Sequence, residues 1–291
     1  MASLARRYSD NAPGDFYVDR TCIDCDACRR IAPAVFAEAA DHSYVRKQPE
    51  TGSERQRALM ALVACPTGSI GTQSRADARP GIDGFPEPVE ENVFFCGFTS
   101  PDSFGAFSYF VQRPEGNVLV DSPRAVRRLL SEFERRGGIR TMFLTHRDDV
   151  AEHEVFARRF GCQRVLHTCD VSGGTREVER KISGLEPVHL ADDLLAIPTP
   201  GHTRGHTVLL YRDRFLFTGD HLAWSASREH LVAFRDACWY SWEEQTRSME
   251  RLLDYSFQWV LPGHGAWHRA ESERAMRKEL ERCIQWMKER P

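Results

Sequence analysis

The sequence has no apolar run long enough to cross a lipid bilayer. None of its hydrophobic stretches approaches the roughly 20 residues that a transmembrane helix needs, and residues 1–16 have no apolar core of a secretory signal. Basic residues (39) are outnumbered by acidic ones (42), and the formal net charge is −3. Without a basic excess, nothing favours nucleic acid or an anionic membrane as a partner. We therefore expect a cytoplasmic globular protein.

The cysteines do not form the pattern of a disulfide framework. Their number, nine, is odd, and three of them fall within seven residues, at Cys22, Cys25 and Cys28. Such clustering favours metal ligation over disulfide bonding and indicates a reducing compartment.

The chain also lacks internal repeats, but its composition changes sharply once. Residues 75–90 are dominated by proline, glycine and charge, and show no regular period, so we interpret them as a linker. This places a small domain at residues 1–78 and a larger one at 79–291. In the larger domain, short β-branched and aromatic runs predict strands at 93–99, 106–112 and 117–121. Helices are predicted at 123–138, 149–160 and 271–289.

The last of these helices has a clear apolar face, formed by Met276, Leu280, Cys283, Ile284 and Met287. Their spacing is that of one side of an α-helix, so we expect this side to pack on a sheet. Strands that come first, with helices interleaved later, predict an α+β fold of two sheets flanked by helices.

The cysteine segment reads CIDCDACRR, and ACPTGSI follows about forty residues later. Thiolates are the soft ligands that iron–sulfur clusters require. Residues 15–75 resemble a single-cluster bacterial ferredoxin, which implies a 4Fe-4S cluster, or a 3Fe-4S form, and one-electron transfer. The resemblance assigns the cluster to Cys22, Cys25, Cys28 and Cys65. A structural zinc knot is the alternative, although zinc sites more often have two C-x2-C pairs.

Histidine and aspartate recur in four motifs that each follow an apolar strand. They lie in loops, most of them rich in glycine, where a sandwich would present ligands at one end, and together they suit one or two divalent ions, iron or zinc. The motifs are LTHRDDVAEH (144–153), TPGHTRGH (199–206), TGDH (218–221) and PGHG (262–265).

This set resembles the metallo-β-lactamase superfamily over about residues 90–267, which implies an αββα sandwich. The resemblance makes His146, His202, Asp220 and His264 metal ligands, with Asp220 and His202 also serving catalysis. It also implies that Asp121 orients a ligand histidine. His206 is more consistent with a structural hydrogen-bonding role than with metal binding.

The first histidine motif departs from the family pattern H-x-H-x-D-H. His146 matches the first ligand and Asp148 the second, as a carboxylate resembling the second ligand of the flavodiiron branch. The last two ligand positions are Val150 and Ala151, which cannot bind metal.

Two neighbours of those positions offer a replacement, since Asp149 and His153 are four residues apart and would share a helix face. Alternatively, Asp149 begins a helix, with Glu152 at capping-box spacing. That interpretation leaves His146 unexplained.

Three functions fit these patterns. The first is a redox enzyme whose ferredoxin domain supplies electrons to a non-haem metal site that acts on a small molecule. The second is a zinc-dependent hydrolase of esters, thioesters or lactones with an accessory cluster. The third is a non-catalytic iron–sulfur sensor. We favour an enzyme and expect an electron donor or acceptor protein as partner; the resemblance also allows a homodimer.

Overall fold

The computed structural model describes residues 2–290, which form two compact units. The first unit contains the chain up to Arg140 together with Ala151–Gly161, and the second contains Thr141–Val150 and the chain from Cys162 onward. Within residues 2–290, no helix combines the length and apolar character that spanning a membrane requires.

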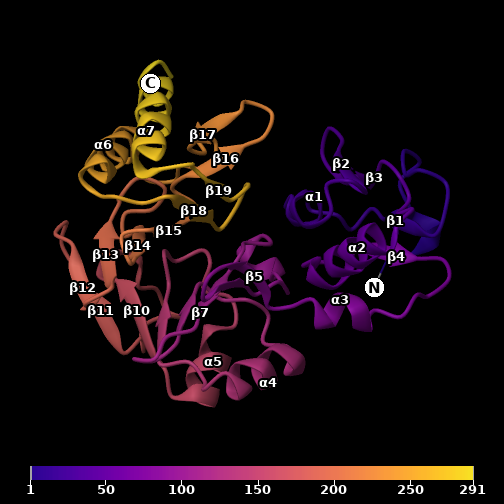
Figure 1. The fold of residues 1–291 in the computed structure, drawn as a ribbon, viewed down its shortest axis with the longest axis horizontal. Helices are drawn as coiled ribbons and strands as arrows, with labels where there is room; N and C mark the ends of the chain where they lie inside the picture. Colours follow the sequence, from indigo (N-terminus) through magenta and orange to yellow (C-terminus); the bar gives the residue numbers. More distant parts are fainter. Residues whose placement is uncertain (1, 291) are drawn as a thin grey trace. The chain divides into compact units, whose positions relative to one another are not determined.

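The N-terminal part of the first unit is a small α+β arrangement (Figure 1). Strand β1 pairs antiparallel with β4, and β2 pairs with β3 in a hairpin. Helix α2 begins with a capping box, in which the Thr51 hydroxyl accepts from the Glu54 N–H and the Glu54 carboxylate accepts in return. The elements are β1 (Phe16–Val18), α1 (Ala27–Ile31), β2 (Phe36–Glu38), β3 (Ser43–Val45), α2 (Gly52–Ala64) and β4 (Ile70–Thr72).

The segment 75–90, which the composition predicted to be a linker, contains a helix and a strand. Helix α3 (Arg79–Asp83) lies against α2, because Gly81 has no side chain and its Cα approaches the backbone of Leu59. Strand β5 (Glu87–Glu90) follows directly. The segment predicted to be a linker is therefore ordered in part, through close backbone packing that is not visible in composition.

The rest of the first unit contains four neighbouring antiparallel strands and two helices. The strands pair in the order β5, β6 (Val93–Phe95), β7 (Tyr109–Val111) and β8 (Val118–Val120). Helices α4 (Arg127–Arg135) and α5 (His153–Phe160) are joined through Phe133, whose ring stacks on Phe110 at 4.6 Å and lies 6.3 Å from Phe156. The predicted strands are present, although each is shorter than expected.

The second unit contains one parallel and one mixed group of strands. Strand β10 pairs in parallel with both β9 and β11. The larger sheet has the order β12-β13-β14-β15-β18-β19, in which only β15 and β18 are parallel. The bounds are β9 (Thr141–Phe143), β10 (Gln163–His167), β11 (Arg180–Ile182), β12 (Val188–Ala191), β13 (Leu194–Pro198), β14 (Thr207–Tyr211), β15 (Phe215–Gly219), β18 (Trp259–Pro262) and β19 (His268–Arg269).

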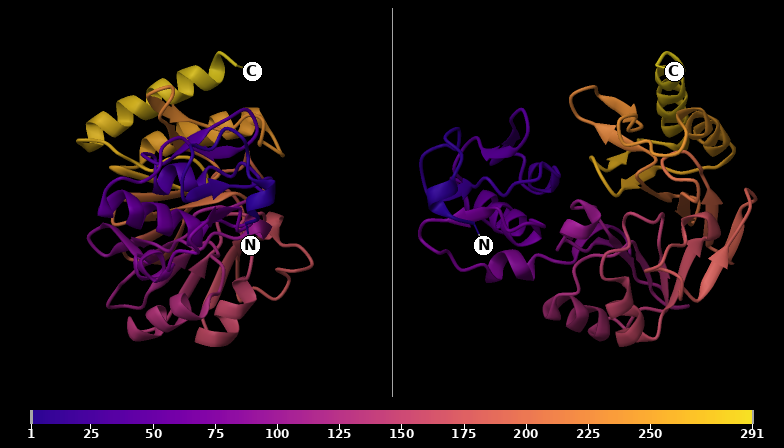
Figure 2. Two further views of the ribbon diagram at one scale, coloured as in Figure 1. Left: turned by 90° about the vertical axis from the view of Figure 1, so that its right-hand side faces the viewer. Right: turned by 180° about the vertical axis from the view of Figure 1, so that it is seen from behind.

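Helices α6 (Trp242–Arg251) and α7 (Glu273–Lys288) lie side by side in this unit, with the hairpin of β16 (Ala223–Ser225) and β17 (His230–Val232) next to α7 (Figures 1 and 2). The buried residues of α7 are the five predicted from its periodicity. They join a core that includes Val208, Leu216 and Val260, so the helix packs on the sheet as expected.

Candidate functional site

All four cysteines of the ferredoxin-like motif line one small cavity. The loop that carries Cys22, Cys25 and Cys28 curls tightly because Asp24 and Asp26 adopt left-handed backbone conformations, at φ 57° and 69°. Cys65 follows the last residue of α2 and reaches the same cavity from the other side. The predicted cysteine cluster is thus brought together by the fold.

Backbone amides point to two of the four sulfurs, and hydrogen bonds of this kind stabilise the thiolates that hold an iron–sulfur cluster. The Ser43 N–H points to the Cys22 Sγ at 3.5 Å, and the Ser69 N–H points to the Cys65 Sγ at 3.3 Å. Burial raises the pKa of the Cys25 thiol to about 12. A buried thiol of this kind ionises when a metal replaces its proton, so the cavity fits a thiolate-bound cluster.

The histidine motifs converge on a second site, built entirely within the second unit. His146 follows β9, His202 follows β13, Asp220 follows β15 and His264 follows β18. Each therefore leaves the end of a buried strand, as the sequence motifs predicted.

Asp220 is at the centre of this site. Its Oδ2 lies 3.8 Å from the His146 Nε2, 3.7 Å from the His202 Nε2 and 3.8 Å from the His264 Nε2. Asp148 adds a second carboxylate, with its Oδ2 3.4 Å from the His202 Nε2 and 3.9 Å from the His146 Nε2. Ligand atoms that each lie about 2.1 Å from one tetrahedral ion are about 3.4 Å apart, so these separations suit a shared metal.

Several polar atoms that face this centre have no hydrogen-bond partner in the protein and could be satisfied by a cation. The His146 Nε2, the His202 Nε2 and the Asp220 Oδ1 are buried and make no hydrogen bond. Such buried polar groups are costly unless a metal or water satisfies them. The Thr145 hydroxyl holds the Nδ1 of His146 at 3.0 Å, which directs the Nε2 toward the carboxylates.

Asp149 reaches the same centre from another side. Its carboxylate, that of Asp220 and the imidazole of His146 offer ligand atoms within 4.8 Å of one another. A Cβ added to Gly263 would lie 2.8 Å from the Asp149 Oδ2 and 2.9 Å from the Asp220 Oδ1, so both oxygens approach the Gly263 backbone. The Asp149 carboxylate therefore lies close to that of Asp220, although Asp149 precedes by one residue the position where the family pattern has its aspartate.

The structure does not support the interpretation of Asp149 as a helix start. Helix α5 begins at His153, four residues later, and the intervening loop contains Ala151 with a positive φ of 28°. Glu152 makes no capping bond; its carboxylate accepts instead from the N–H of Ala125. His153 is buried at the first turn of α5 in the first unit, and its assignment as a ligand remains a prediction.

The surroundings keep the imidazole of His146 neutral and the carboxylates of Asp148 and Asp220 ionised. Burial lowers the pKa of His146 to about 4, against the opposing effect of Asp220. Burial alone would raise the pKa of Asp220, but His264, His146 and His202 outweigh it and hold that pKa below its usual value. The close approach of the His202 Nε2, 3.4 Å from the Asp148 Oδ2, lowers the pKa of Asp148. Imidazole nitrogens beside ionised carboxylates form a ligand set for a divalent cation.

His206 has the structural role predicted for it. Its Nδ1 lies 2.9 Å from the Thr199 hydroxyl, and its Nε2 accepts from the backbone N–H of Asp220 at 3.3 Å. His206 therefore fixes the backbone of Asp220 through this hydrogen bond.

Asp170 was missed in the sequence, although it also follows a buried strand. Its buried carboxylate accepts from the N–H of Arg147, the N–H of Gly205 and the hydroxyl of Thr203. It thereby ties the loop of His146 to the loop of His202. The signal for it in the sequence is an acidic residue just after the apolar run of β10, in VLHTCD.

The segment 233–242 is hydrogen-bonded to the backbone of His202. The N–H groups of Trp239 and Tyr240 donate to the His202 carbonyl at 2.9 and 3.1 Å, and both side chains are exposed. Cys96, Cys162 and Cys283 are buried, whereas Cys169 is exposed.

Comparison with known proteins agrees with both parts of the chain. Residues 18–72 match the family described as "4Fe-4S single cluster domain of Ferredoxin I". The solved structure of DIM-1 metallo-β-lactamase exposed to ceftazidime superposes with a TM-score of 0.53 and 19% identity, covering 67% of this chain and 95% of that one. The chain has the metallo-β-lactamase fold. It joins this fold to an iron–sulfur domain of the ferredoxin type, which confirms the two predicted resemblances and the α+β class.

Two further relatives agree with this assignment. The metallo-β-lactamase from Pontibacter korlensis superposes with a TM-score of 0.50 and 16% identity, over 67% of this chain and 97% of that one. The Drosophila melanogaster protein named "Beta-lactamase-like protein 2 homolog" is 36% identical over 69 residues. That match spans 24% of this chain and about a fifth (20%) of the fly protein.

Proposed function

We propose that the protein is a redox metalloenzyme whose ferredoxin-type domain supplies electrons to a non-haem metal site that acts on a small-molecule substrate. The cluster is assigned to Cys22, Cys25, Cys28 and Cys65. One metal ion is assigned to His146, Asp148, His202 and Asp220, and Asp149 and His264 extend the site toward a second ion.

The observation that carries the proposal is direct contact between the cysteine site and the chain of the metallo-β-lactamase fold. A Cβ added to Gly105, in the loop between β6 and β7, would lie 2.8 Å from the Cys25 Sγ. Arg124, four residues after β8, donates to the carbonyl oxygens of Val63 at 2.7 Å and Cys65 at 3.4 Å. The iron–sulfur domain is therefore not a loosely tethered addition.

The chemistry of the histidine site is a second support. Its ligand set contains as many carboxylates as imidazoles, and Asp148 stands where the family pattern has a histidine. Two histidines with carboxylates and open positions are typical of non-haem iron, whereas zinc prefers nitrogen and sulfur ligands. When bound, such a metal supplies Lewis-acid and one-electron chemistry.

The protein's own residues have separable roles in this proposal. Asp220 brings negative charge to the midpoint of three histidines, and His202 presents an imidazole beside the partly exposed Asp148. Trp239, 61% exposed with its ring 6.2 Å from that of His202, provides an apolar surface on which a small substrate can pack.

Metal and sulfide analysis of anaerobically purified protein tests the proposal. We expect iron to exceed acid-labile sulfide by one or two atoms per chain, with little zinc. Asp220→Ala should remove the excess iron and retain the sulfide, whereas Cys25→Ser should do the reverse. On mixing the reduced protein with oxygen, nitric oxide or a persulfide, the cluster should reoxidise faster in wild type than in Asp220→Ala.

Other results would contradict redox chemistry. Zinc in the histidine site, with turnover of esters or thioesters that survives Cys25→Ser, would establish a hydrolase. A cluster with no further metal, together with partner binding that depends on the cluster, would establish a sensor.

A further inference from the structure

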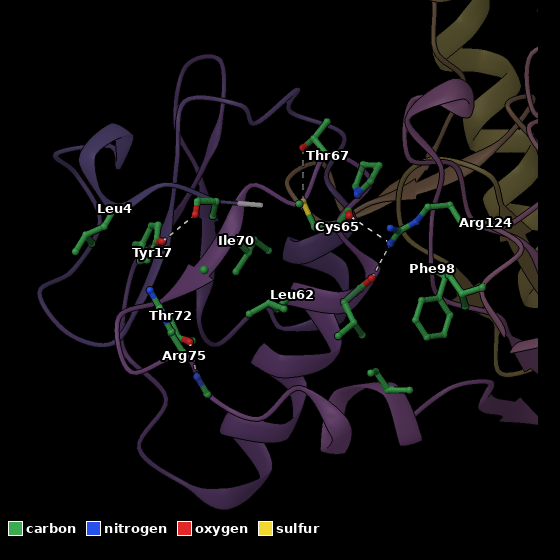
Figure 3. A pocket seen from close by; sticks show the side chains of 18 of the residues that line it. Leu4, Tyr17, Leu62, Cys65, Thr67, Ile70, Thr72, Arg75, Phe98 and Arg124 are labelled. Carbon is green, nitrogen blue, oxygen red and sulfur yellow. Dashed lines mark hydrogen bonds between the residues drawn. The ribbon is translucent and has the colours of Figure 1, made fainter. Parts of the chain in front are cut away.

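A broad groove of about 1200 Å³ runs along the first unit beside the cysteine site (Figure 3). Its apolar surface includes Leu62 and Val63 of α2, Ile70 of β4 and Phe98 from the loop after β6. Leu4, at one end, is 43% exposed. The groove exceeds the roughly 300–1,000 Å³ of typical small-molecule pockets, so its size favours the surface of another protein.

The groove lies against the cavity of the predicted cluster. Cys65, Pro66, Thr67 and Ile70 line both the groove and the cysteine cavity. A partner seated in the groove would therefore be separated from the cluster by one layer of residues. Figure 3 shows Cys65 between Thr67 and the side chain of Arg124, which extends toward it.

The charged residues that line the groove are all of one sign. They are Arg75, Arg124 and Arg128, with no aspartate, glutamate or lysine among the lining residues. Arg75 is exposed, and the guanidinium of Arg124 donates to backbone carbonyl groups at the end of α2. Arg128 pairs with Asp83 at 3.3 Å, but both side chains are largely exposed, so the pair is weak. Cations around an apolar surface are complementary to an acidic protein.

We propose that this groove docks an acidic one-electron carrier protein, which reduces the cluster through the Cys65–Pro66 edge. The inference rests on the cluster of the proposed function being redox-active. One electron leaves the reduced cofactor of the carrier and one enters the cluster; no covalent bond forms or breaks.

Binding and electron transfer can be measured with reduced flavodoxin, a small acidic flavin protein, as the probe. The test variant carries Arg75→Glu and Arg128→Glu, which reverse two exposed charges without touching a cysteine ligand. The control carries Arg158→Glu and Arg282→Glu, which make the same change in net charge outside the groove. Photochemical reduction with a neutral deazaflavin reports whether each cluster is intact and reducible.

We expect the test variant to bind flavodoxin at least tenfold more weakly and to accept its electrons correspondingly more slowly in stopped-flow measurements. Wild-type binding should weaken with salt, because exposed charges are screened. The control variant should match wild type, and photochemical reduction should be equal in all three proteins.

Several results would overturn the docking proposal. The first is equal binding of flavodoxin by wild type and the test variant, and the second is an equal loss of affinity in the test and control variants. The third is that wild type binds basic cytochrome c as tightly as flavodoxin. The fourth is that neither flavodoxin nor an acidic [2Fe–2S] ferredoxin binds wild type. A cluster that deazaflavin cannot reduce would instead contradict the proposed redox function, while the binding measurement would still decide the groove.

Discussion

The cysteine site and the histidine site solve the problem of holding a metal in opposite ways. Three of the four cysteines come from one curled loop, and backbone amides point to their sulfurs. The histidine site collects its side chains from four separate loops, and three of its imidazole nitrogens lie within 4 Å of the Asp220 carboxylate. The first site thus depends on local backbone geometry, and the second on the alignment of strands that are distant in sequence.

The two metal-free sites also respond to pH in opposite ways, because one buries imidazoles and the other buries thiols. Burial lowers the pKa of His146 to about 4, and it lowers that of His221, the buried residue directly after Asp220, to about 3. Both therefore stay neutral in the folded protein. Burial raises the pKa of Cys25 to about 12, so this thiol stays protonated. The histidine site is therefore weakened by acid and the cysteine site by alkali. Two substitutions and one pH series can each disturb one of the two sites and leave the other intact.

The largest effect is expected from Gly263→Ala, which would break the histidine site alone. The new Cβ would lie within 3 Å of carboxylate oxygens of both Asp149 and Asp220 and would force them apart. Affinity for the metal of this site should fall by about 100-fold or more, judged from the 10–100-fold effect of residues that only support ligands. Metal titration of the variant measures this, with sulfide content unchanged.

Gly173→Ala is the matched control, because a Cβ at that position meets nothing within 4 Å. If both variants bound metal as wild type does, the carboxylates near Gly263 would not be ligands.

An intermediate effect is expected from acid on the metal-free protein. Because the folded pKa of His146 and of His221 is below the ordinary 6.5, the unfolded chain binds more protons between pH 6.5 and 4. The stability is full above pH 6.5 and should fall by about 1.4 kcal/mol per pH unit for each histidine as the pH drops through this range. Denaturant unfolding of chelated protein over a pH series measures the slope.

His221→Gln should reduce that slope, and His189→Gln, at an exposed position, should leave it unchanged. Equal slopes in all three proteins would show that buried histidines do not cause the acid sensitivity. Above pH 9 the stability should fall again, because the unfolded thiols then ionise and the buried one does not.

The smallest effect is expected from Gly105→Ala, which tests the cysteine site. Gly105 has a φ of +85°, and an added Cβ would lie 2.7 Å from the Cβ of Cys25. The backbone strain should cost about 1 kcal/mol, and displacement of Cys25 should shorten the lifetime of the cluster in air several-fold. Visible absorbance during exposure to air measures the lifetime.

Gly184→Ala has the same backbone strain, at φ +84°, but its Cβ would meet nothing within 4 Å. Only the Gly105 variant should lose its cluster faster. Equal lifetimes would mean that the contact with Cys25 does not matter.

The sequence predicted features that depend on local spacing. The cysteine loop, the apolar face of α7 and the positions of His146, His202, Asp220 and His264 after strands all follow from patterns within a few residues. The prediction of a helix start at Asp149 was wrong for the opposite reason. Glu152 had the spacing of a capping box, but its carboxylate binds the distant Ala125 N–H, and the helix begins later.

Other features depended on tertiary contacts that no local pattern contains. The segment 75–90 is ordered because Gly81 fits against α2, although its composition is that of a linker. Asp170 holds two site loops together through three donors from distant positions, and Cys169 beside it is exposed. The sequence shows which residues these are, but it does not show which loops lie close together in the fold.

Arg124 has a consequence for how the protein is made. It binds carbonyl groups at the end of α2, beside Cys65, yet it is translated about sixty residues after them. While only the first hundred residues have left the ribosome, the last turn of α2 has no such partner. The end of α2 therefore gains this contact only after β8 and the residues that follow it have been synthesised.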